Sequence, residues 1–469
     1  MLLLIAAIAA VWYFASGKGC GTVSPETTQS SGFSLGTLFD EKKYSATEIF
    51  EPLADNIRNP LPESVSLLKY APPRLNQGQQ GSCVAWASAY GARSILESRE
   101  TGKNPTDCRF SPSFLYNQIA LKGCQGAYLP EAMKVMKGQG LAPFEDMPYN
   151  DNDCSAKPGD MQLRKASDFK IDGYQRLTQG DNTQKVDMLA IKQNLAQGAP
   201  VVIGMMVGGS FMQGMLGQDK WIPEESDYNM PGFGGHAMCV IGYDDYKFGQ
   251  NQGGFQIMNS WGPEWGNKGV GWVSYGDFDY FVKEAYGLYP MGSADAPTTT
   301  QLEAKVGIVL NANDQNLPLI YSSGSLFKTS RPMKSGEEFK LQATNNIACY
   351  IYVFGQETDG SSYVLFPYTP KHSPFCGITG TRLFPNDHSM YPDEVGNEDF
   401  FAVVISKDPL DYNEFNSRLT KAPGSNFEQK LSSLTNSNNG VRIQQGATIN
   451  LNLDFATTSI AGVVISVQK

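Results

Sequence analysis

A cysteine in this chain lies where thiol chemistry is favoured. Cys83 follows the glycine-rich run NQGQQGS and begins the predicted helix CVAWA. A thiol at a helix start meets the positive end of the helix dipole and unpaired backbone N–H groups, and both lower its pKa. We therefore interpret Cys83 as a nucleophile that is ionised before its substrate arrives.

Such a nucleophile needs a group that protonates the leaving amine, and an imidazole is the usual one. Of the three histidines, His372 and His388 lie beyond a predicted domain boundary, which leaves His236. Two glycines before His236 would let a substrate backbone approach. Asn259, in the sequence NSWG, can accept the second imidazole N–H, and Trp261 would shield that bond from water.

Helices are predicted first and strands afterwards in the part of the chain that carries these residues. Helical spacing, a Ser-Pro start and glycine stops predict helices at 83–99, from 111 to 123 and near 186–196. Ser82 is the predicted cap of the first. Short β-prone runs follow at 201–203, 236–243, 255–258 and 270–275. The predicted fold class is α+β.

Past Lys305 the pattern is mostly β. The runs KVGIVL, EFKLQAT, CYIYVFG, YVLFPY, FFAVVIS, TINLNL and GVVISVQ alternate with turn signals. Several short strands at such spacing predict a sandwich, with a helical stretch near 413–434 packed on its face. Cys349 and Cys376 are candidates for a bridge there.

Length and charge narrow the function classes. A chain of 469 residues is long enough for two folded domains. Its net charge of −10 would repel phosphate backbones, which excludes nucleic acid as a partner. The apolar run over 1–15 is short for a membrane span and fits a secretory signal better, or a membrane tether if it is retained. Eight cysteines are compatible with an oxidising compartment.

Three segments resemble the papain family of cysteine peptidases, in the family's order. They are residues 77–87 around the cysteine, GGHA around the histidine, and NSWGPEWG around the asparagine. LPESV at 61–65 and GCQG at 123–126 are further matches, so the resemblance covers roughly Leu61 to Pro290. It implies a two-lobed peptidase, with a helical lobe followed by a β-sheet lobe.

The resemblance also implies roles for other residues. Gln77 falls on the family's oxyanion-hole glutamine, whose N–H would act together with the backbone N–H of Cys83. Gly126 and Ala127 should pair with substrate backbone. Gly235 and Met205 are expected in the pocket for the residue two places before the cut, which would then prefer apolar side chains.

The chain also departs from the family pattern. The family's second cysteine is replaced by Gln80, so Cys124 is expected to pair with either Cys154 or Cys108. The region before Leu61 is too short for the long helical propeptide of lysosomal relatives, so the sequence does not support an inhibitory role for it. The Gly/Met-rich stretch between Met205 and His236 is expected to be a mobile flap over the cleft.

The predicted domains follow from these boundaries. They are a signal or anchor segment at 1–19, a linker or short pro-region at 20–60, the peptidase at 61–292, a linker at 293–304 and a β-rich accessory domain at 305–469. The last resembles a β-rich domain of unassigned function found in bacterial proteins, and we expect it to bind a protein or cell-surface partner.

The predicted function is a bacterial, extracytoplasmic cysteine peptidase that acts on protein or peptide substrates without a cofactor or metal. Two alternatives remain: acyl transfer to an amine by the same thiol, and a non-catalytic peptide-binding protein on the same fold. Product analysis with added amines would separate the first alternative. Release of one equivalent of leaving group from an activated ester would argue against the second.

Overall fold

The computed structural model describes residues 33–54, 57–180, 185–289, 300–435, 442–444 and 447–469. Residues 33–469 form one compact unit. The predicted signal or anchor segment and residues 20–32 and 293–299 of the predicted linkers lie outside the described residues. Within the described residues, no helix has both the length and the apolar character of a membrane span.

The helix that starts at Cys83 is one long helical run. It comprises α3 (Cys83–Ala85), a π-helical stretch (Trp86–Arg93) and α4 (Ser94–Thr101). Residues 83–98 are all buried. Most of them are small or apolar, and the two charged side chains, Arg93 and Glu97, form an ion pair with each other (2.9 Å). Gly91 permits the closest packing, since a Cβ there would lie 3.0 Å from Cβ of Cys239.

Further helices complete the helical lobe. Ser111 accepts a hydrogen bond from the backbone N–H of Phe114 (2.9 Å) and caps α5 (Pro112–Ile119), which ends before the predicted stop at Gly123. The others are α6 (Leu129–Gly138), α7 (Asp160–Ala166) and short 3-10 turns at Leu68–Tyr70, Pro105–Cys108, Phe144–Asp146 and Ser167–Phe169.

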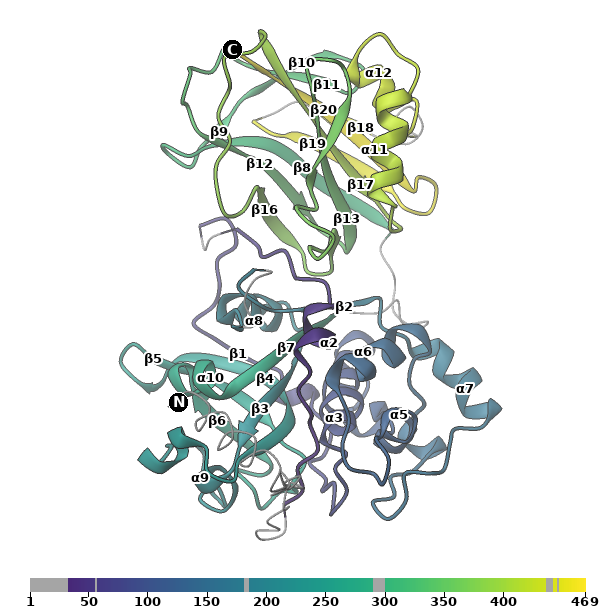
Figure 1. Cartoon of the computed structure of the whole chain (residues 1–469), viewed down its shortest axis with the longest axis vertical. Helices are drawn as coiled ribbons and strands as arrows, with labels where there is room; N and C mark the ends of the chain where they lie inside the picture. Colours follow the sequence, from purple (N-terminus) through teal and green to yellow (C-terminus); the bar gives the residue numbers. More distant parts are fainter. Residues whose placement is uncertain (1–32, 55–56, 181–184, 290–299, 436–441, 445–446) are drawn as a thin grey trace, which may run out of the picture. The chain divides into compact units, whose positions relative to one another are not determined.

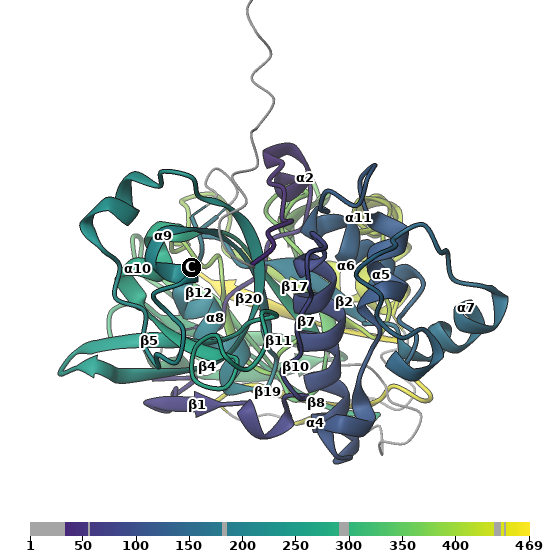
Figure 2. The same ribbon diagram turned by 90° about the horizontal axis from the view of Figure 1, so that it is seen from below.

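An antiparallel sheet forms the second lobe. Its strand order is β2 (Gly173–Arg176), β7 (Val282–Tyr289), β3 (Val201–Val207), β4 (Gly234–Gly249), β5 (Gln252–Met258) and β6 (Val270–Ser274), and β1 (Ser64–Ser66) also pairs with β4. Helices α8 (Met188–Ala196) and α10 (Tyr275–Phe281) pack against it. Figures 1 and 2 show the residues that precede α2 (Glu41–Ser45) running between these two lobes.

The expected flap between Met205 and His236 is packed against the sheet lobe. It contains α9 (Gly209–Met212) and a 3-10 turn (Glu225–Asn229), and Phe211 and Trp221 are buried. The indole N–H of Trp265 donates to the carbonyl of Phe211 (2.9 Å). Aromatic side chains thus hold the segment against the sheet lobe in this structure, and its mobility stays a prediction.

The C-terminal residues form the predicted sandwich. One sheet has the order β10 (Leu319–Ser323), β11 (Leu326–Thr329), β20 (Ile460–Gln468), β17 (Glu398–Ser406), β13 (Cys349–Gln356) and β14 (Ser362–Phe366), and β15 (Phe375–Cys376) pairs with β13. The other has the order β16 (Gly380–Phe384), β12 (Phe339–Asn345), β8 (Gln301–Leu310), β19 (Ile449–Asp454) and β18 (Arg442–Gln444), and β9 (Asn316–Leu317) pairs with β8. The predicted α+β class is confirmed.

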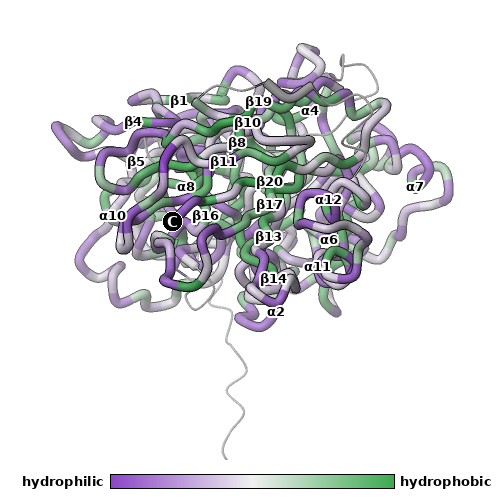
Figure 3. The backbone as a smooth tube through the Cα atoms, turned by 90° about the horizontal axis from the view of Figure 1, so that it is seen from above, coloured by the Kyte–Doolittle hydropathy of each residue, from purple (hydrophilic) through white to green (hydrophobic). Residues whose placement is uncertain are grey.

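Alternation along the central strands explains the layers of this domain. Ile351 and Val353 of β13 face the core between the sheets, whereas Tyr352 and Phe354 face the other way. On that outer face lie α11 (Tyr412–Lys421) and α12 (Phe427–Ser432), as predicted for the helical stretch. The tube in Figure 3 is hydrophobic along β17 and β20, which are buried between these layers.

Candidate active site

The thiol of Cys83 is fully buried at the start of the helical run. Ser82 holds the position before the helix, but its hydroxyl contacts that of Tyr149 (2.6 Å) and makes no capping bond, so the predicted side-chain cap is wrong. The hydroxyl of Thr37 lies 3.3 Å from the sulfur. The backbone N–H of Ala237, the residue after His236, also points at the sulfur, which places the histidine strand directly beside the thiol.

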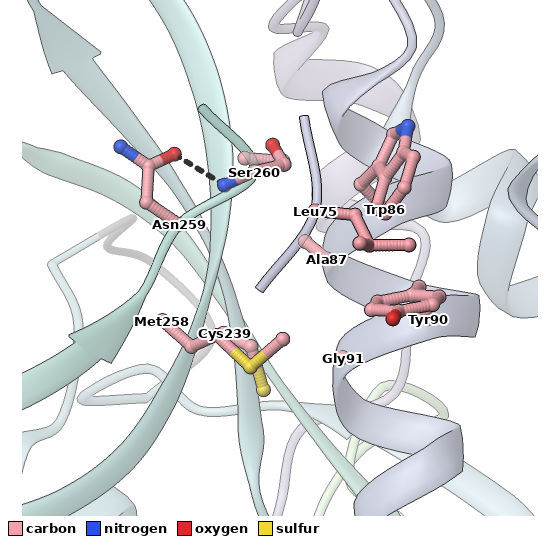
Figure 4. Close-up of a pocket in the computed structure, with 10 residues that line it drawn as sticks. Leu75, Trp86, Ala87, Tyr90, Gly91, Cys239, Met258, Asn259 and Ser260 are labelled. Atoms are coloured by element: carbon pink, nitrogen blue, oxygen red, sulfur yellow. Dashed lines mark hydrogen bonds between the residues drawn. The ribbon is translucent and has the colours of Figure 1, made fainter. Parts of the chain in front are cut away.

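His236 and Asn259 are hydrogen-bonded to each other. Nε2 of His236 lies 2.7 Å from Oδ1 of Asn259, and Figure 4 shows the same oxygen accepting the backbone N–H of Ser260 (2.8 Å). The indole of Trp261 stacks on the imidazole at 4.2 Å and 25°. Nδ1 of His236 makes no hydrogen bond within the described part of the chain, so it is available to take a proton.

Burial sets the charge state of this pair. It raises the pKa of the Cys83 thiol, against the lowering effect of the Thr37 hydroxyl and the neighbouring N–H groups. It lowers the pKa of His236 to about 4, against the raising effect of the bond to Asn259. Burial therefore disfavours the charged form of both groups in this state, in which the groove is filled. The ionised thiol stays a prediction for the open groove.

Gln77 lies beside the thiol with its amide N–H groups already engaged. Nε2 donates to the carbonyls of Ser34 (3.1 Å) and Gln80 (3.0 Å), and Oε1 accepts from the hydroxyl of Ser260 (2.6 Å). The bond from Ser260 fixes the orientation of the carboxamide. Its N–H is therefore directed at a backbone carbonyl, as an oxyanion donor must be.

Residues 33–40, which we call the cleft segment, fill the groove between the lobes. The N–H groups of Gly36 and Thr37 donate to the carbonyl of Gly235 (3.2 and 3.0 Å). Ala127 donates to the carbonyl of Gly36 (2.8 Å) and accepts from the N–H of Leu38 (3.1 Å), in a parallel bridge. Ala127, which was expected to pair with substrate backbone, thus pairs with the chain itself, whereas the N–H of Gly126 donates to the hydroxyl of Tyr116 (3.1 Å).

The other predicted binding residues have different positions. A Cβ on Gly126 would lie 2.3 Å from the carbonyl oxygen of Gly36, so only glycine allows this approach. Trp261 stacks on Phe33 at 4.7 Å and donates its indole N–H to the carbonyl of Ser34 (3.1 Å).

Met205 does not lie where it was expected. Its strand neighbour Gly204 approaches the ring of Phe39, and Met205 pairs with His236 on the opposite face of β3. Gly204 and Gly235 therefore face Phe39, and the placement of Met205 in this pocket is wrong.

The cleft segment does not present a peptide bond for cleavage. The carbonyl that Gln77 holds belongs to Ser34, whereas the group that meets the sulfur is the hydroxyl of Thr37. Cleavage requires one carbonyl to reach the nucleophile and the oxyanion donors together. The segment can therefore fill the groove and remain intact.

The other cysteines among the described residues are either in a disulfide or buried as free thiols. Cys124 pairs with Cys154, one of the two expected partners, and this disulfide closes the loop that leads to Gly126; Cys108 is free. Cys349 and Cys376 are opposite each other in β13 and β15 but are both free, so the suggested bridge is absent.

Cys239 is buried in the interface behind the site. Figure 4 shows it facing the helical run beside Tyr90 and Gly91. Its side chain is fully buried, as expected of a core cysteine, and burial raises the pKa of the thiol.

Sequence reasoning missed the residues of the cleft segment. Ser/Thr/Gly-rich composition before Ser34 predicts a tether, and the prediction extended that linker to residue 60. The one local signal was Gly36, a glycine between Leu35 and Thr37. Gly36 packs against the backbone of Gly81, and a backbone partner leaves no mark in the side-chain sequence.

Two parts of the chain are similar to known protein families. Residues 62–285 match the family described as papain family cysteine protease, and residues 333–409 match a domain of unknown function (DUF4384). An uncharacterised peptidase C1-like protein of Acanthamoeba polyphaga mimivirus is 30% identical over 210 residues, which cover 43% of this chain and 64% of that protein. Mouse cathepsin K is 30% identical over 213 residues, 45% of this chain and 58% of cathepsin K.

A solved structure also matches part of the chain. The cysteine protease xylellain from Xylella fastidiosa is 25% identical with a TM-score of 0.45, and the match covers 56% of this chain and 97% of xylellain. The chain therefore spans less than two thirds of the length of the curated relatives it matches first, and nearly all of one solved cysteine protease.

Proposed function

We propose, from the premise that residues 62–285 belong to the papain family of cysteine proteases, that this chain is a cysteine peptidase. The observation that carries the proposal is the buried pair His236–Asn259 under Trp261, beside the thiol of Cys83 and with Gln77 aimed at a backbone carbonyl. In this structure the cleft segment occupies the groove, so the proposal describes the enzyme after that segment has left.

The reaction begins once a peptide replaces the cleft segment. Nδ1 of His236 takes the proton of the Cys83 thiol as the sulfur attacks the carbonyl carbon. Negative charge develops on the carbonyl oxygen, and N–H donors from Gln77 and the backbone of Cys83 stabilise it, each donor contributing about 3–4 kcal/mol.

The protonated imidazole then gives its proton to the leaving amine, and the C–N bond breaks. The acyl group remains on the sulfur as a thioester. Water attacks the thioester while His236 takes the water proton, and the imidazole returns that proton to the sulfur. Asn259 keeps the imidazole in one orientation throughout, and Trp261 keeps water away from their bond.

Substitution of Cys83 tests this proposal. Hydrolysis of a fluorogenic peptide library by Cys83→Ala should fall by about 10³-fold or more in kcat/KM. Cys108→Ala is the matched control, because Cys108 is a buried free thiol in another part of the helical lobe. Equal activity of wild type and Cys83→Ala would overturn the proposal, and so would labelling by a thiol-directed epoxide that does not depend on His236.

We also propose that the peptidase acts outside the cytoplasm, with residues 1–19 as signal or membrane anchor. The apolar run over 1–15 and the disulfide between Cys124 and Cys154 support this location. Cell fractionation, with and without residues 1–19, tests it. Equal amounts of the two forms in the cytoplasmic fraction would contradict it.

A further inference from the structure

The chain that leads out of the cleft is buried along most of its length. After the cleft segment and α2 come residues 47–54, which we call the strap. Ile49, Phe50, Glu51 and Leu53 of the strap are at most 5% exposed. A segment of this kind is a structural element and not a loose linker.

The strap is bonded through its backbone on both sides. On one side, Phe50 donates to the carbonyl of Arg176 (3.1 Å) and Arg176 donates to the carbonyl of Glu48 (2.9 Å). On the other side, Ile49 donates to the carbonyl of Lys371 (2.7 Å) and accepts from the N–H of Ser373 (3.0 Å). The strap is therefore one strand between β2, the edge strand of the peptidase sheet, and residues 371–373 of the accessory domain.

Side chains of the accessory domain also hold the strap. The hydroxyl of Ser373 donates to the carboxylate of Glu48 (2.6 Å), and that of Tyr368 donates to Glu51 (3.2 Å). Nε of Arg382, a fully buried side chain, donates to the carbonyl of Glu51 (3.2 Å). Buried hydrogen bonds to particular side chains favour one geometry, so the contacts of Glu51 with Tyr368 and Arg382 define a specific binding surface.

A second group of contacts follows where the strap ends. Ala54 donates to the carbonyl of Thr381 (2.8 Å). The side chain of Asn59 accepts from the N–H of Thr381 (2.8 Å) and donates to its carbonyl (3.0 Å). Arg58 donates to the carbonyl of Asp314 (2.6 Å).

The accessory domain is also bonded directly to the peptidase. Gln175 of β2 donates to the carbonyl of Phe375 (2.9 Å), and Thr379 donates its N–H to Gln197 (2.7 Å). Each of these partners lies in residues 371–382 or close to them in the chain. One region of the accessory domain thus contacts both the strap and the domain whose groove the cleft segment fills.

We propose that the accessory domain, whose family has no known function, is a latch that keeps the cleft segment in the catalytic groove. The inference rests on the proposed peptidase function. The latch acts through effective concentration, because a segment held at one end near its site rebinds far more often than a free one. Only α2 separates the strap from the cleft segment. Release of the strap therefore lowers the occupancy of the groove.

The peptidase itself holds α2, which sets the size of the effect. Tyr44 is buried and its hydroxyl accepts the N–H of Ala285 (3.1 Å), and Lys43 forms an ion pair with Glu131 (2.8 Å). These contacts remain when the accessory domain lets go. We therefore expect partial opening of the groove and not complete loss of the segment.

Hydrogen exchange on the full chain tests the latch without relying on catalysis. The double variant Glu48→Ala/Asn59→Ala removes the contact of the strap with Ser373 and the contacts of Asn59, which follows the strap, with Thr381. It changes no group in the groove. The amides of Gly36, Thr37 and Leu38 should then exchange about tenfold faster, as expected for the loss of several hydrogen bonds. Labelling of Cys83 by a thiol-directed epoxide should accelerate by a similar factor.

Arg331→Ala is the matched control, because Arg331 is an exposed residue of the accessory domain that pairs with Glu337 and does not touch the strap. Ala54→Pro is an independent second variant that removes the N–H bonded to Thr381. Unchanged exchange at Gly36, Thr37 and Leu38 in both strap variants would overturn the latch. Faster exchange without hydrolysis of any peptide would support the latch and argue against the peptidase function.

Discussion

The cleft segment and the strap are held by the rest of the protein in different ways. In the groove, the contacts of the cleft segment with Gly235 and Ala127 run through backbone atoms. Glycine at 36, 126 and 235 makes the close approach possible. Along the strap, buried side chains such as Phe50, Glu51 and Leu53 add to the backbone bonds.

Because of this difference, filling of the groove and specific binding of the N-terminal chain are carried out by separate contacts. Backbone bonds are open to almost any extended chain, so the groove can exchange the cleft segment for a substrate. Buried side chains specify one partner, so the strap determines which segment is kept beside the groove. Substitutions and changes of pH at the cleft segment or at the strap test this difference.

The largest expected effect comes from Gly36→Val. A Cβ at this position would lie 2.0 Å from the carbonyl oxygen of Gly81, which is backbone and cannot move aside. Overpacking of this kind costs about 1–3 kcal/mol, equivalent to labelling of Cys83 by an epoxide that is faster by about fivefold to about 150-fold. Exchange at the strap amides Ile49 and Ala54 should stay unchanged. Faster exchange at those amides would mean that the two ends are not separate.

Acidification should weaken the cleft end. Burial lowers the pKa of His236 to about 4, below its ordinary value near 6.5, so the buried state disfavours the protonated ring. Its contribution to stability is complete above about pH 6.5 and is lost as the pH falls towards 4. Exchange at Gly36, Thr37 and Leu38, measured as the ratio of wild type to His236→Gln, should rise roughly tenfold between pH 7 and pH 4.5. A constant ratio would contradict this assignment.

The strap end should respond in the opposite direction. Burial raises the pKa of Glu51 to about 8, although Arg382 and the hydroxyl of Tyr368 lower it. The protonated form therefore stabilises the folded state below about pH 4.5, and this contribution is lost as the pH rises through 8. Glu51→Gln should slow exchange at Ile49 and Ala54 a few-fold at pH 8 and have no effect at pH 5. The idea fails if the variant and wild type keep the same ratio at both values.

The smallest expected effect is that of Ser34→Ala. The side chain of Ser34 is bonded to the carbonyl of Gln79 (3.0 Å) at an exposed position, whereas Gln77 and Trp261 bind its backbone carbonyl. Removal of the hydroxyl should therefore change epoxide labelling of Cys83 by less than about twofold. A larger change would show that side chains, and not only backbone, hold the cleft end.

Much of the catalytic constellation was readable from the sequence because local motifs encode it. A glycine-rich turn before Cys83, two glycines before His236 and a tryptophan after Asn259 each leave a mark within a few residues. The strands of the sandwich were readable for a related reason, since their alternation is local. The start of α5 was equally clear from Ser111 and Pro112.

What the sequence did not reveal depends on distant partners. The surroundings of the Cys83 thiol include Thr37, which is 46 residues away in the chain and whose hydroxyl lies 3.3 Å from the sulfur. Met205 and Gly204 are neighbours in the chain, and only the strand register decides which of them faces the groove. The strap looked like linker because its burial comes from two domains at once.

The double bonding of the strap has a consequence for solubility. A sheet that ends in β2 would expose a row of unpaired N–H and C=O groups, and such edges invite pairing with other chains. The strap satisfies that row, and residues 371–373 in turn cover the strap. Release of the strap would expose the edge of the sheet at β2 to pairing with other chains. The same contacts that govern access to the thiol therefore also protect the protein from aggregation.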